Sequence, residues 1–505
     1  MPLTQEELET IQRECFADDV PIHFEQMRLW SSDEARAFFE AGGELPADGY
    51  RAHESAATMV SLGACLPNAP VPLTRPPAAA VDTAADASSS SSSSSSADAS
   101  ASVPPEDDAG RIFCVSDLHT DHAPNLEWCR ALRDRAVFRR DVLVVAGDVT
   151  SSIVLLRETL EILVAAFGTV FYVPGNHDLW VKGRGLSGGL HVRPTPIDSL
   201  QKLDEILELC GQLGVETQPA YARGAIVAPL LAWYHASWDT EPDVSGWTGI
   251  PPAEAVMVDF HACKWPPPLS SADDSIAIRL DTLNDGRVPG ARPTQREKVE
   301  ALRAAHPAAP LITLSHFVPR IELTPEKRFL FFPPLAKAVG SVHLAARIAA
   351  LRPAVHVFGH THFGWDATLD DGVRYLQAPL AYPDERAGRL GTIATGETFP
   401  HGEPPTPLLV YDAVARAFPM RYDAGWSNFY AKYPRRPELS HLVAPYVASR
   451  YKRVDGVGQV GWLAEGDNPT MSPEGEPTPA WALGPTSALS VEKNVRATGR
   501  QLGKT

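Results

Sequence analysis

The sequence predicts an α+β fold in which sheets and helices pack in layers. From Arg111 onward, apolar runs of strand length alternate with stretches of helical periodicity. Polar residues of metal-binding types follow directly after five of these runs. Both observations are typical of a layered domain whose functional residues lie at strand ends.

Each element of this domain is predicted from its own pattern. One helix is indicated by the spacing of Leu200, Leu203 and Ile206, and a second by that of Leu344 and Ile348. The expected strands are the apolar runs 112–115, 142–145, 171–173, 311–314 and 355–358, with further strands near Tyr375 and at 408–411.

The chain divides into four predicted segments. They are a small helical segment at 1–66, a disordered linker at 67–109, the layered domain with insertions and a C-terminal extension at 110–464, and a disordered tail at 465–505. Thr4 and Glu7 have the spacing of a capping box, which favours a helix near the start. The linker is rich in Pro, Ala, Asp and Ser, with nine consecutive serines at 88–96, and cannot bury enough apolar surface to fold.

The charge balance and the cysteine spacing limit the function classes. A formal net charge of −17 argues against long-range attraction to nucleic acid or to an anionic membrane. The six cysteines form no C-x-x-C pair, so neither a zinc ribbon nor a disulfide framework is expected. No apolar run approaches the roughly 20 residues that span a bilayer, and the first residues are acidic. The sequence therefore favours a cytoplasmic protein.

The polar residues that follow the predicted strands form five blocks. They are Asp117-Leu-His119, Gly147-Asp148, Gly175-Asn176-His177-Asp178, a lone His316, and Gly359-His360-Thr361-His362. Positions two apart can point to the same side of a loop, so the first and last blocks can each present two ligands. Among the lone histidines, His316 is preferred because it follows a strand into a loop, whereas His356 alternates within an apolar strand.

The residue types of these blocks favour a metal site. Imidazole and carboxylate together suit Mn, Fe, Zn or Ni better than Ca, whose sites are built from oxygen. Two divalent ions beside Asp117 and Asp148 would leave a surplus charge of about +2, which favours an anionic substrate. The neutral amide of Asn176 preserves that surplus. The blocks therefore predict a site that binds phosphate through two metal ions.

In this order, the five blocks resemble the signature of calcineurin-like metallophosphoesterases from Asp117 to His362. The resemblance implies a four-layer αββα sandwich, with two mixed sheets flanked by helices and a dinuclear metal centre at strand-end loops. It also implies hydrolysis of a phosphate ester by a metal-bound hydroxide.

The resemblance further implies a role for each block. One ion would be bound by Asp117, His119 and His362, the other by Asn176, His316 and His360, and Asp148 would bridge them. His177 would be the catalytic residue that contacts the substrate. The Ser/Thr protein phosphatase branch has an acidic residue where this chain has Ser151, which argues against protein phosphatase activity. The segment from Ser315 to Glu326 and the cluster Trp233-Tyr234-His235 resemble an uncharacterised branch of plants and bacteria, which implies no particular substrate.

Four further residues are candidates for substrate binding. Arg320 and Arg328 follow His316 closely and could clamp a phosphate, although a surface ion pair is an equally good interpretation of each. Trp233 and His235 belong to an aromatic cluster that could wall a cleft, although packing is the commoner role.

The predicted function is metal-dependent hydrolysis of a small phosphomonoester or nucleotide. A phosphodiesterase is the alternative, because the two reactions differ only in whether the pocket admits a second ester substituent. A non-catalytic scaffold is a further alternative, disfavoured because every ligand position is filled. The expected partner is a phosphorylated small molecule; a protein bound by the linker or tail is compatible with catalysis, and neither membrane nor nucleic acid is expected.

Overall fold

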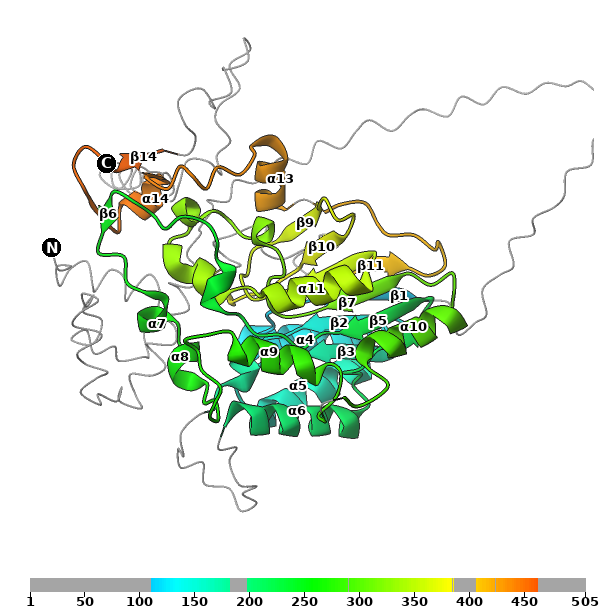
Figure 1. Ribbon diagram of the computed structural model, residues 1–505. Helices are drawn as coiled ribbons and strands as arrows, with labels where there is room; N and C mark the ends of the chain where they lie inside the picture. The colour runs from blue at the N-terminus through cyan, green and yellow to red at the C-terminus, as the bar shows by residue number, and fades with distance from the viewer. Residues whose placement is uncertain are drawn as a thin grey trace, which may run out of the picture.

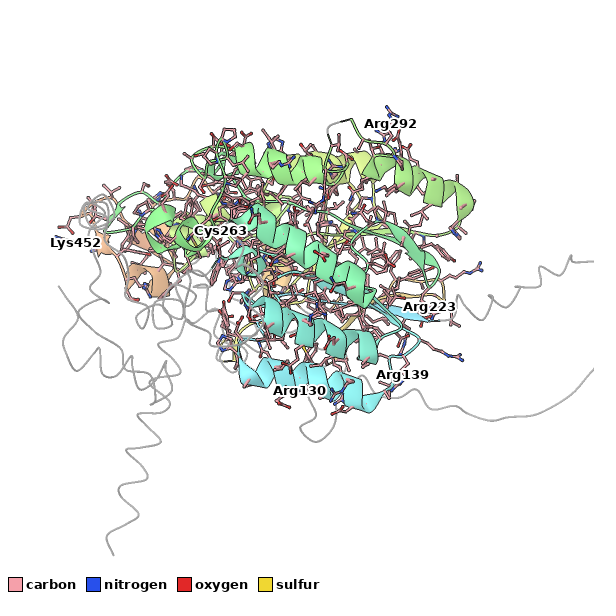
Figure 2. All side chains as sticks on the ribbon, turned by 90° about the horizontal axis from the view of Figure 1, so that it is seen from below. Arg130, Arg139, Arg223, Cys263, Arg292 and Lys452 are labelled. Atoms are coloured by element: carbon pink, nitrogen blue, oxygen red, sulfur yellow. The ribbon has the colours of Figure 1, made fainter. Side chains whose placement is uncertain are left out.

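A computed structural model describes residues 110–181, 198–288, 290–383, 385, 406–422 and 424–461 (Figure 1). The predicted N-terminal helical segment, linker and tail lie outside the described residues, so the segment boundaries stay predictions. Basic side chains such as Arg223, Arg292 and Lys452 lie at the periphery of the described part (Figure 2).

The first sheet has four strands in the order β11-β1-β2-β3. Strands β1, β2 and β3 run parallel, and β11 pairs antiparallel with β1. Their bounds are β1 Arg111–Val115, β2 Val142–Ala146, β3 Thr169–Val173 and β11 Leu408–Asp412. Because β1, β2 and β3 run parallel, the loops that follow them all lie at the same edge of the sheet.

The second sheet has six strands in the order β4-β5-β7-β8-β10-β9. The four central strands run parallel, and the edge strands β4 and β9 are antiparallel to their neighbours. Their bounds are β4 Ala220–Ala222, β5 Ala225–Pro229, β7 Leu311–Leu314, β8 Val355–Phe358, β9 Trp365–Thr368 and β10 Arg374–Gln377. Both sheets are therefore mixed.

Among the described α-helices, α5, α6, α10 and α11 begin at a side chain that caps them. Asp198 accepts a hydrogen bond from the backbone of Gln201 at the start of α6, and Thr294 and Glu297 form a capping box at α10. The α-helices are α4 Ala123–Arg135, α5 Ile153–Ala166, α6 Ser199–Leu213, α7 Ala253–Val256, α8 Asp259–Ala262, α9 Ser275–Leu283, α10 Gln295–Ala305, α11 Val342–Leu351, α13 Gly425–Lys432 and α14 Pro445–Ala448. Short 3-10 helices are His177–Leu179, Ala236–Trp238, Ile321–Leu323, Lys327–Phe329 and Pro333–Ala338.

Alternation along the strands divides the apolar residues between two cores. In β1, Ile112 and Cys114 pack against residues of the second sheet such as Val227 and Ile312. Phe113 and Val115 face the other way and join the core that includes α4, α5 and α6. Helix α5 contacts β3, and α10 contacts β4 and β5. The predicted four-layer α+β sandwich is confirmed.

The C-terminal extension packs on the segment around residue 326. The Tyr430 hydroxyl accepts a hydrogen bond from the Glu326 backbone at 2.9 Å, and the Ala444 backbone donates to the Arg328 carbonyl at 3.1 Å. Two small sheets complete this part, β12 (Leu442–Val443) with β14 (Gln459–Val460) and β13 (Lys452–Arg453) with β6 (Trp247–Thr248).

Among the helices that the structure describes, none has the length and apolar character needed to cross a membrane.

Candidate metal centre

The five sequence blocks meet at one edge of the sandwich. Each follows the carboxyl end of a parallel strand: β1, β2 and β3 of the first sheet, and β7 and β8 of the second. The ends of adjacent parallel strands lie together, so residues distant in sequence become neighbours. All seven predicted metal ligands are buried there: Asp117, His119, Asp148, Asn176, His316, His360 and His362.

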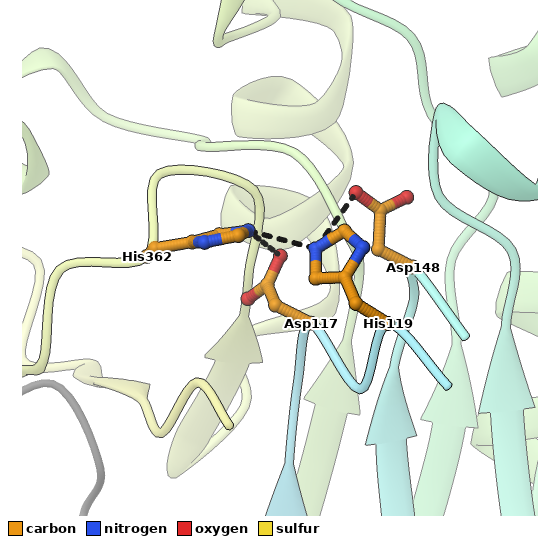
Figure 3. A group of neighbouring side chains, drawn as sticks. All are labelled: Asp117, His119, Asp148 and His362. Atoms are coloured by element: carbon orange, nitrogen blue, oxygen red, sulfur yellow. Dashed lines mark hydrogen bonds and ion pairs between the residues drawn. The ribbon is translucent and has the colours of Figure 1, made fainter. Parts of the chain in front are cut away.

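One group of potential ligands consists of Asp117, His119, Asp148 and His362, each with one ligand atom within 4.8 Å of the others (Figure 3). His362 Nε2 lies 2.9 Å from His119 Nε2 and 3.4 Å from Asp117 Oδ1. His119 Nε2 lies 3.9 Å from Asp148 Oδ2. Nitrogen and oxygen atoms therefore converge on one small volume.

A second group consists of Asp148, His316 and His360. His316 Nε2 lies 3.4 Å from Asp148 Oδ2. The Asn176 Oδ1 atom lies 2.9 Å from both His316 Nε2 and His360 Nδ1, and so belongs to the same cluster. Asp148 is common to the two groups. The donor set suits two adjacent divalent ions of the kinds that accept imidazole and carboxylate.

Hydrogen bonds on the far side of three histidines set their tautomers. His316 Nδ1 lies 2.9 Å from the Ala146 carbonyl, and His360 Nε2 lies 2.8 Å from the Ala338 carbonyl. A carbonyl only accepts, so these nitrogens carry the protons and the opposite nitrogens face the cluster as potential ligands. His362 Nδ1 lies 2.7 Å from Glu385 Oε2, which directs its Nε2 to the cluster in the same way.

The backbone adopts an unusual conformation at the site. Asp117, His119, Asp148, His360 and His362 all have φ between 42° and 77°, the left-handed region that non-glycine residues rarely occupy. Each such residue costs on the order of 1–3 kcal/mol and persists only where surrounding contacts enforce it. Asp178 supplies such contacts, because its carboxylate accepts hydrogen bonds from four backbone N–H groups, those of Asp148, Val149, Thr150 and Gly175.

Two glycines are required by close approach. A Cβ at Gly175 would lie 2.2 Å from Asp148 Oδ1, and one at Gly359 would lie 2.7 Å from the Ala146 carbonyl oxygen. Neither position has room for a larger residue. The glycines that precede the ligands in sequence therefore let the strand-end loops pack against one another.

The electrostatics of the metal-free site favour protonated histidines beside the carboxylates. Burial lowers the pKa of His316, but the attraction of the Asp148 carboxylate outweighs the effect of burial and raises this pKa to about 9. Burial likewise opposes the charge on His362, yet Asp117 and Glu385 raise its pKa to about 10. Burial lowers the pKa of His360 to about 3 and raises that of Asp148 to about 6. Cations would replace the protons on His316 and His362.

His177 lies beside the cluster but makes different contacts. Its ring stacks on Trp180, with ring centroids 3.7 Å apart, and its Nε2 lies 3.9 Å from Asp148 Oδ2. Its side chain is 11% exposed, whereas those of His119, His316 and His362 are at most 3% exposed. Burial and the neighbouring histidines hold the His177 pKa well below its usual value, so the ring is neutral. It is therefore placed to meet a ligand that enters from solvent.

The four candidate substrate residues have other partners. Arg320 forms ion pairs with Glu322, Asp370 and Asp371, and Arg328 is buried with Glu326 and the ring of Phe329. Trp233 is buried against Tyr234, Trp265 and Phe317. His235 contacts the Ser237 hydroxyl and accepts from the Val342 backbone. The structure brings none of the four into the two ligand groups. Their contacts favour structural roles, as ion-pair partners for the two arginines and as packed or hydrogen-bonded side chains for Trp233 and His235.

Sequence reasoning left out three residues that the structure places at the centre. Glu385 contacts His362, Tyr382 stacks on His119 with ring centroids 4.3 Å apart, and Asp259 accepts a hydrogen bond from Asn176. None belongs to a block that follows a predicted strand. No pattern in the neighbouring sequence identifies these residues, because only the fold brings them into contact with the ligands.

Comparisons with known proteins agree with this geometry. The profile of the calcineurin-like phosphoesterase family matches residues 110–364. The chain belongs to this family, which depends on two metal ions, and it is a phosphoester hydrolase.

The chain is similar to the [acyl-carrier-protein] phosphodiesterase PptH of Mycobacterium tuberculosis, with 26% identity over 283 residues, 54% of this chain and 78% of that protein. A crystal structure of phosphopantetheinyl hydrolase PptH from Mycobacterium tuberculosis matches 56% of this chain and 93% of its own, with 24% identity and a TM-score of 0.35. A dimetal phosphatase from Danio rerio matches 54% of this chain and 87% of its own, with 14% identity and a TM-score of 0.30.

Proposed function

We propose that this chain hydrolyses a phosphate ester at a dinuclear metal centre, with Asp148 as the ligand common to both ions. One observation carries the proposal: two groups of buried ligand-type side chains share the Asp148 carboxylate. A side chain shared by two adjacent groups of ligand-type atoms is the arrangement that a bridging metal ligand requires.

The proposed ligands follow from this sharing. Asp117, His119 and His362 bind one ion, and Asn176, His316 and His360 bind the other. The hydrogen bonds of His316 and His360 to backbone carbonyls support this assignment, because each directs the opposite ring nitrogen toward Asn176 Oδ1, where it can bind a cation after losing any proton it carries. The donor set is compatible with Mn, Fe, Zn or Ni.

Two bound divalent ions would acidify a water molecule for attack on phosphorus and offset charge on the phosphoryl oxygens. Asp117 and Asp148 neutralise only part of the cationic charge, so an anionic substrate is attracted locally although the chain is acidic overall. His177 would donate a hydrogen bond from its ring N–H to a phosphoryl or leaving oxygen. Its neutral ring has one N–H for this purpose, and Trp180 holds the ring plane.

The substrate class that we propose is a phosphodiester. The supporting observation is the similarity to PptH, which is described as a phosphodiesterase of acyl-carrier protein. A small phosphomonoester or nucleotide is the second candidate, since the same ligands and the same His177 serve both reactions.

Turnover of two model substrates tests the proposal. The full chain is stripped of metal, refilled with Mn²⁺, and assayed on para-nitrophenyl phosphate and on bis-para-nitrophenyl phosphate. We expect metal-dependent turnover, faster on the diester, that Asp148→Asn abolishes. The matched control is Asp198→Asn, which makes the same chemical change at a helix N-cap where asparagine serves equally well. Absence of turnover with Mn²⁺, Fe²⁺, Zn²⁺ and Ni²⁺ on both substrates would contradict the proposal.

A further inference from the structure

Asp259 lies behind the proposed ligand Asn176, in a segment that none of the five sequence blocks contains. It is the first residue of α8, and its side chain is buried, with the residue only 2% exposed. Cys263, which follows this helix, is buried as well. One face of this short helix, with Asp259 and Ala262, is therefore buried and holds the carboxylate in place, whereas His261 is exposed.

Two donors converge on one oxygen of this carboxylate. Asp259 Oδ1 accepts a hydrogen bond from Asn176 Nδ2 at 2.9 Å and another from Trp180 Nε1 at 2.6 Å. Hydrogen bonds to a carboxylate are stronger than those between neutral groups. The first bond holds a proposed metal ligand, and the second holds the ring on which His177 stacks.

The chemistry of the pair determines which way the Asn176 amide points. An amide has an oxygen that accepts and a nitrogen that donates, and a carboxylate can only accept. The nitrogen must therefore face Asp259, and the oxygen must face His316 Nε2 and His360 Nδ1, each 2.9 Å away. The reversed amide would present an NH₂ group, which has no free electron pair for a cation.

We propose that Asp259 is a positioning residue that selects the metal-binding orientation of Asn176 through the hydrogen bond to Asn176 Nδ2. This inference rests on the proposed function, because it assumes that Asn176 binds an ion. It adds a determinant of metal affinity that comes from α8 and not from a strand-end loop. A residue that only secured α8 in the core would have no effect on the choice between the two amide orientations.

Direct metal binding by the full chain tests the inference without any assay of turnover. Mn²⁺ is titrated by calorimetry into metal-free wild type, Asp259→Ala, Asp259→Asn and Tyr234→Phe. We expect Asp259→Ala to weaken one of two binding events by roughly 10- to 100-fold, the usual effect of losing a hydrogen-bond partner of a ligand. Asp259→Asn keeps an oxygen that can accept from Asn176, and we expect it to retain most of the affinity.

Tyr234→Phe is the matched control. The Tyr234 hydroxyl lies beside the Asp259 carboxylate, so its removal disturbs the same buried group without touching Asn176. We expect unchanged Mn²⁺ affinity in this variant. Wild-type affinity in Asp259→Ala would overturn the inference, and so would equal losses in Asp259→Ala and Tyr234→Phe. If wild type bound no Mn²⁺, Fe²⁺, Zn²⁺ or Ni²⁺, the proposed function itself would fail. Should Asp259→Ala not fold, a large loss of affinity in a folded Asp259→Asn would overturn the inference.

Discussion

The Asp178 carboxylate accepts a hydrogen bond from the backbone nitrogen of Asp148 at 2.9 Å. Asp178 is buried and belongs to neither ligand group, but through this bond it fixes the loop that carries Asp148, the ligand that the two groups share. The same carboxylate accepts from the backbone of Gly175 at 2.8 Å, which belongs to the loop after the neighbouring strand. Asp178 therefore joins two loops whose side chains meet at the proposed metal centre.

Asp178→Asn is expected to destabilise the protein and weaken metal binding together. The amide nitrogen would face backbone N–H groups that need an acceptor, and leaving such buried donors unsatisfied costs about 1–3 kcal/mol. Urea unfolding of the metal-free protein measures the stability, and Mn²⁺ titration measures the affinity. Asp198→Asn, at the half-buried N-cap of α6, serves as the control. Unchanged stability in Asp178→Asn would show that these hydrogen bonds do not hold the loops.

Much of this arrangement could be predicted from the sequence, because each ligand lies within a few positions of the strand that it follows. The predicted strands at 311–314 and 355–358 coincide with β7 and β8, and each ends two positions before a proposed ligand, His316 and His360. Strand β5 was not predicted, since its residues Ala225–Pro229 include two alanines and a proline, which are uncommon in strands. It nevertheless lies inside the second sheet between β4 and β7, where pairing with both neighbours outweighs propensity.

The residues that orient the ligands were not accessible in the same way. Asp259 lies 83 positions after Asn176, and Glu385 lies 23 positions after His362. Each acts through a hydrogen bond that depends on how distant segments pack, and no periodicity or spacing encodes such a contact. For Arg320 and Arg328 the sequence favoured a phosphate clamp and an ion pair equally, and only the fold identifies the carboxylates that pair with them.

Metal binding is expected to release protons. The pKa of His316 is raised to about 9 and that of His362 to about 10, so both rings are protonated at pH 7.5 in the metal-free protein. A ligand nitrogen must lose its proton, so we expect about two protons to be released as both ions bind, and affinity to rise from pH 7 to pH 9. Calorimetry in two buffers of different ionisation enthalpy measures the proton count. A heat of binding that is independent of the buffer would contradict this prediction.

Acid should destabilise the fold through His356. This ring is buried between the hydroxyls of Thr313 and Ser315, and burial lowers its pKa to about 3. The unfolded chain takes up a proton near pH 6.5 but the folded chain does not, so stability falls as pH decreases from 6.5 toward 3, by up to about 1.4 kcal/mol per pH unit. Urea unfolding at pH 7.5 and 5.5 should show a smaller difference in His356→Gln, whose amide does not titrate. An identical pH dependence in the two proteins would assign the effect to other groups.

Gly175→Ala is expected to abolish metal binding while the protein still folds. The new Cβ would lie 2.2 Å from Asp148 Oδ1, 2.7 Å from the Asp148 backbone nitrogen and 2.8 Å from His316 Cδ2, so the loop that carries the shared carboxylate must move away from one or both groups. The matched control is Gly211→Ala in α6, where a Cβ meets nothing within 4 Å. Because glycine is unfavourable within a helix, this control should gain about 0.5–1 kcal/mol of stability and bind Mn²⁺ as wild type does. Circular dichroism establishes that both variants are folded, and metal analysis after dialysis gives the stoichiometry. Two bound ions in Gly175→Ala would mean that the site accommodates a displaced Asp148, which would remove the main support for its role as the shared ligand.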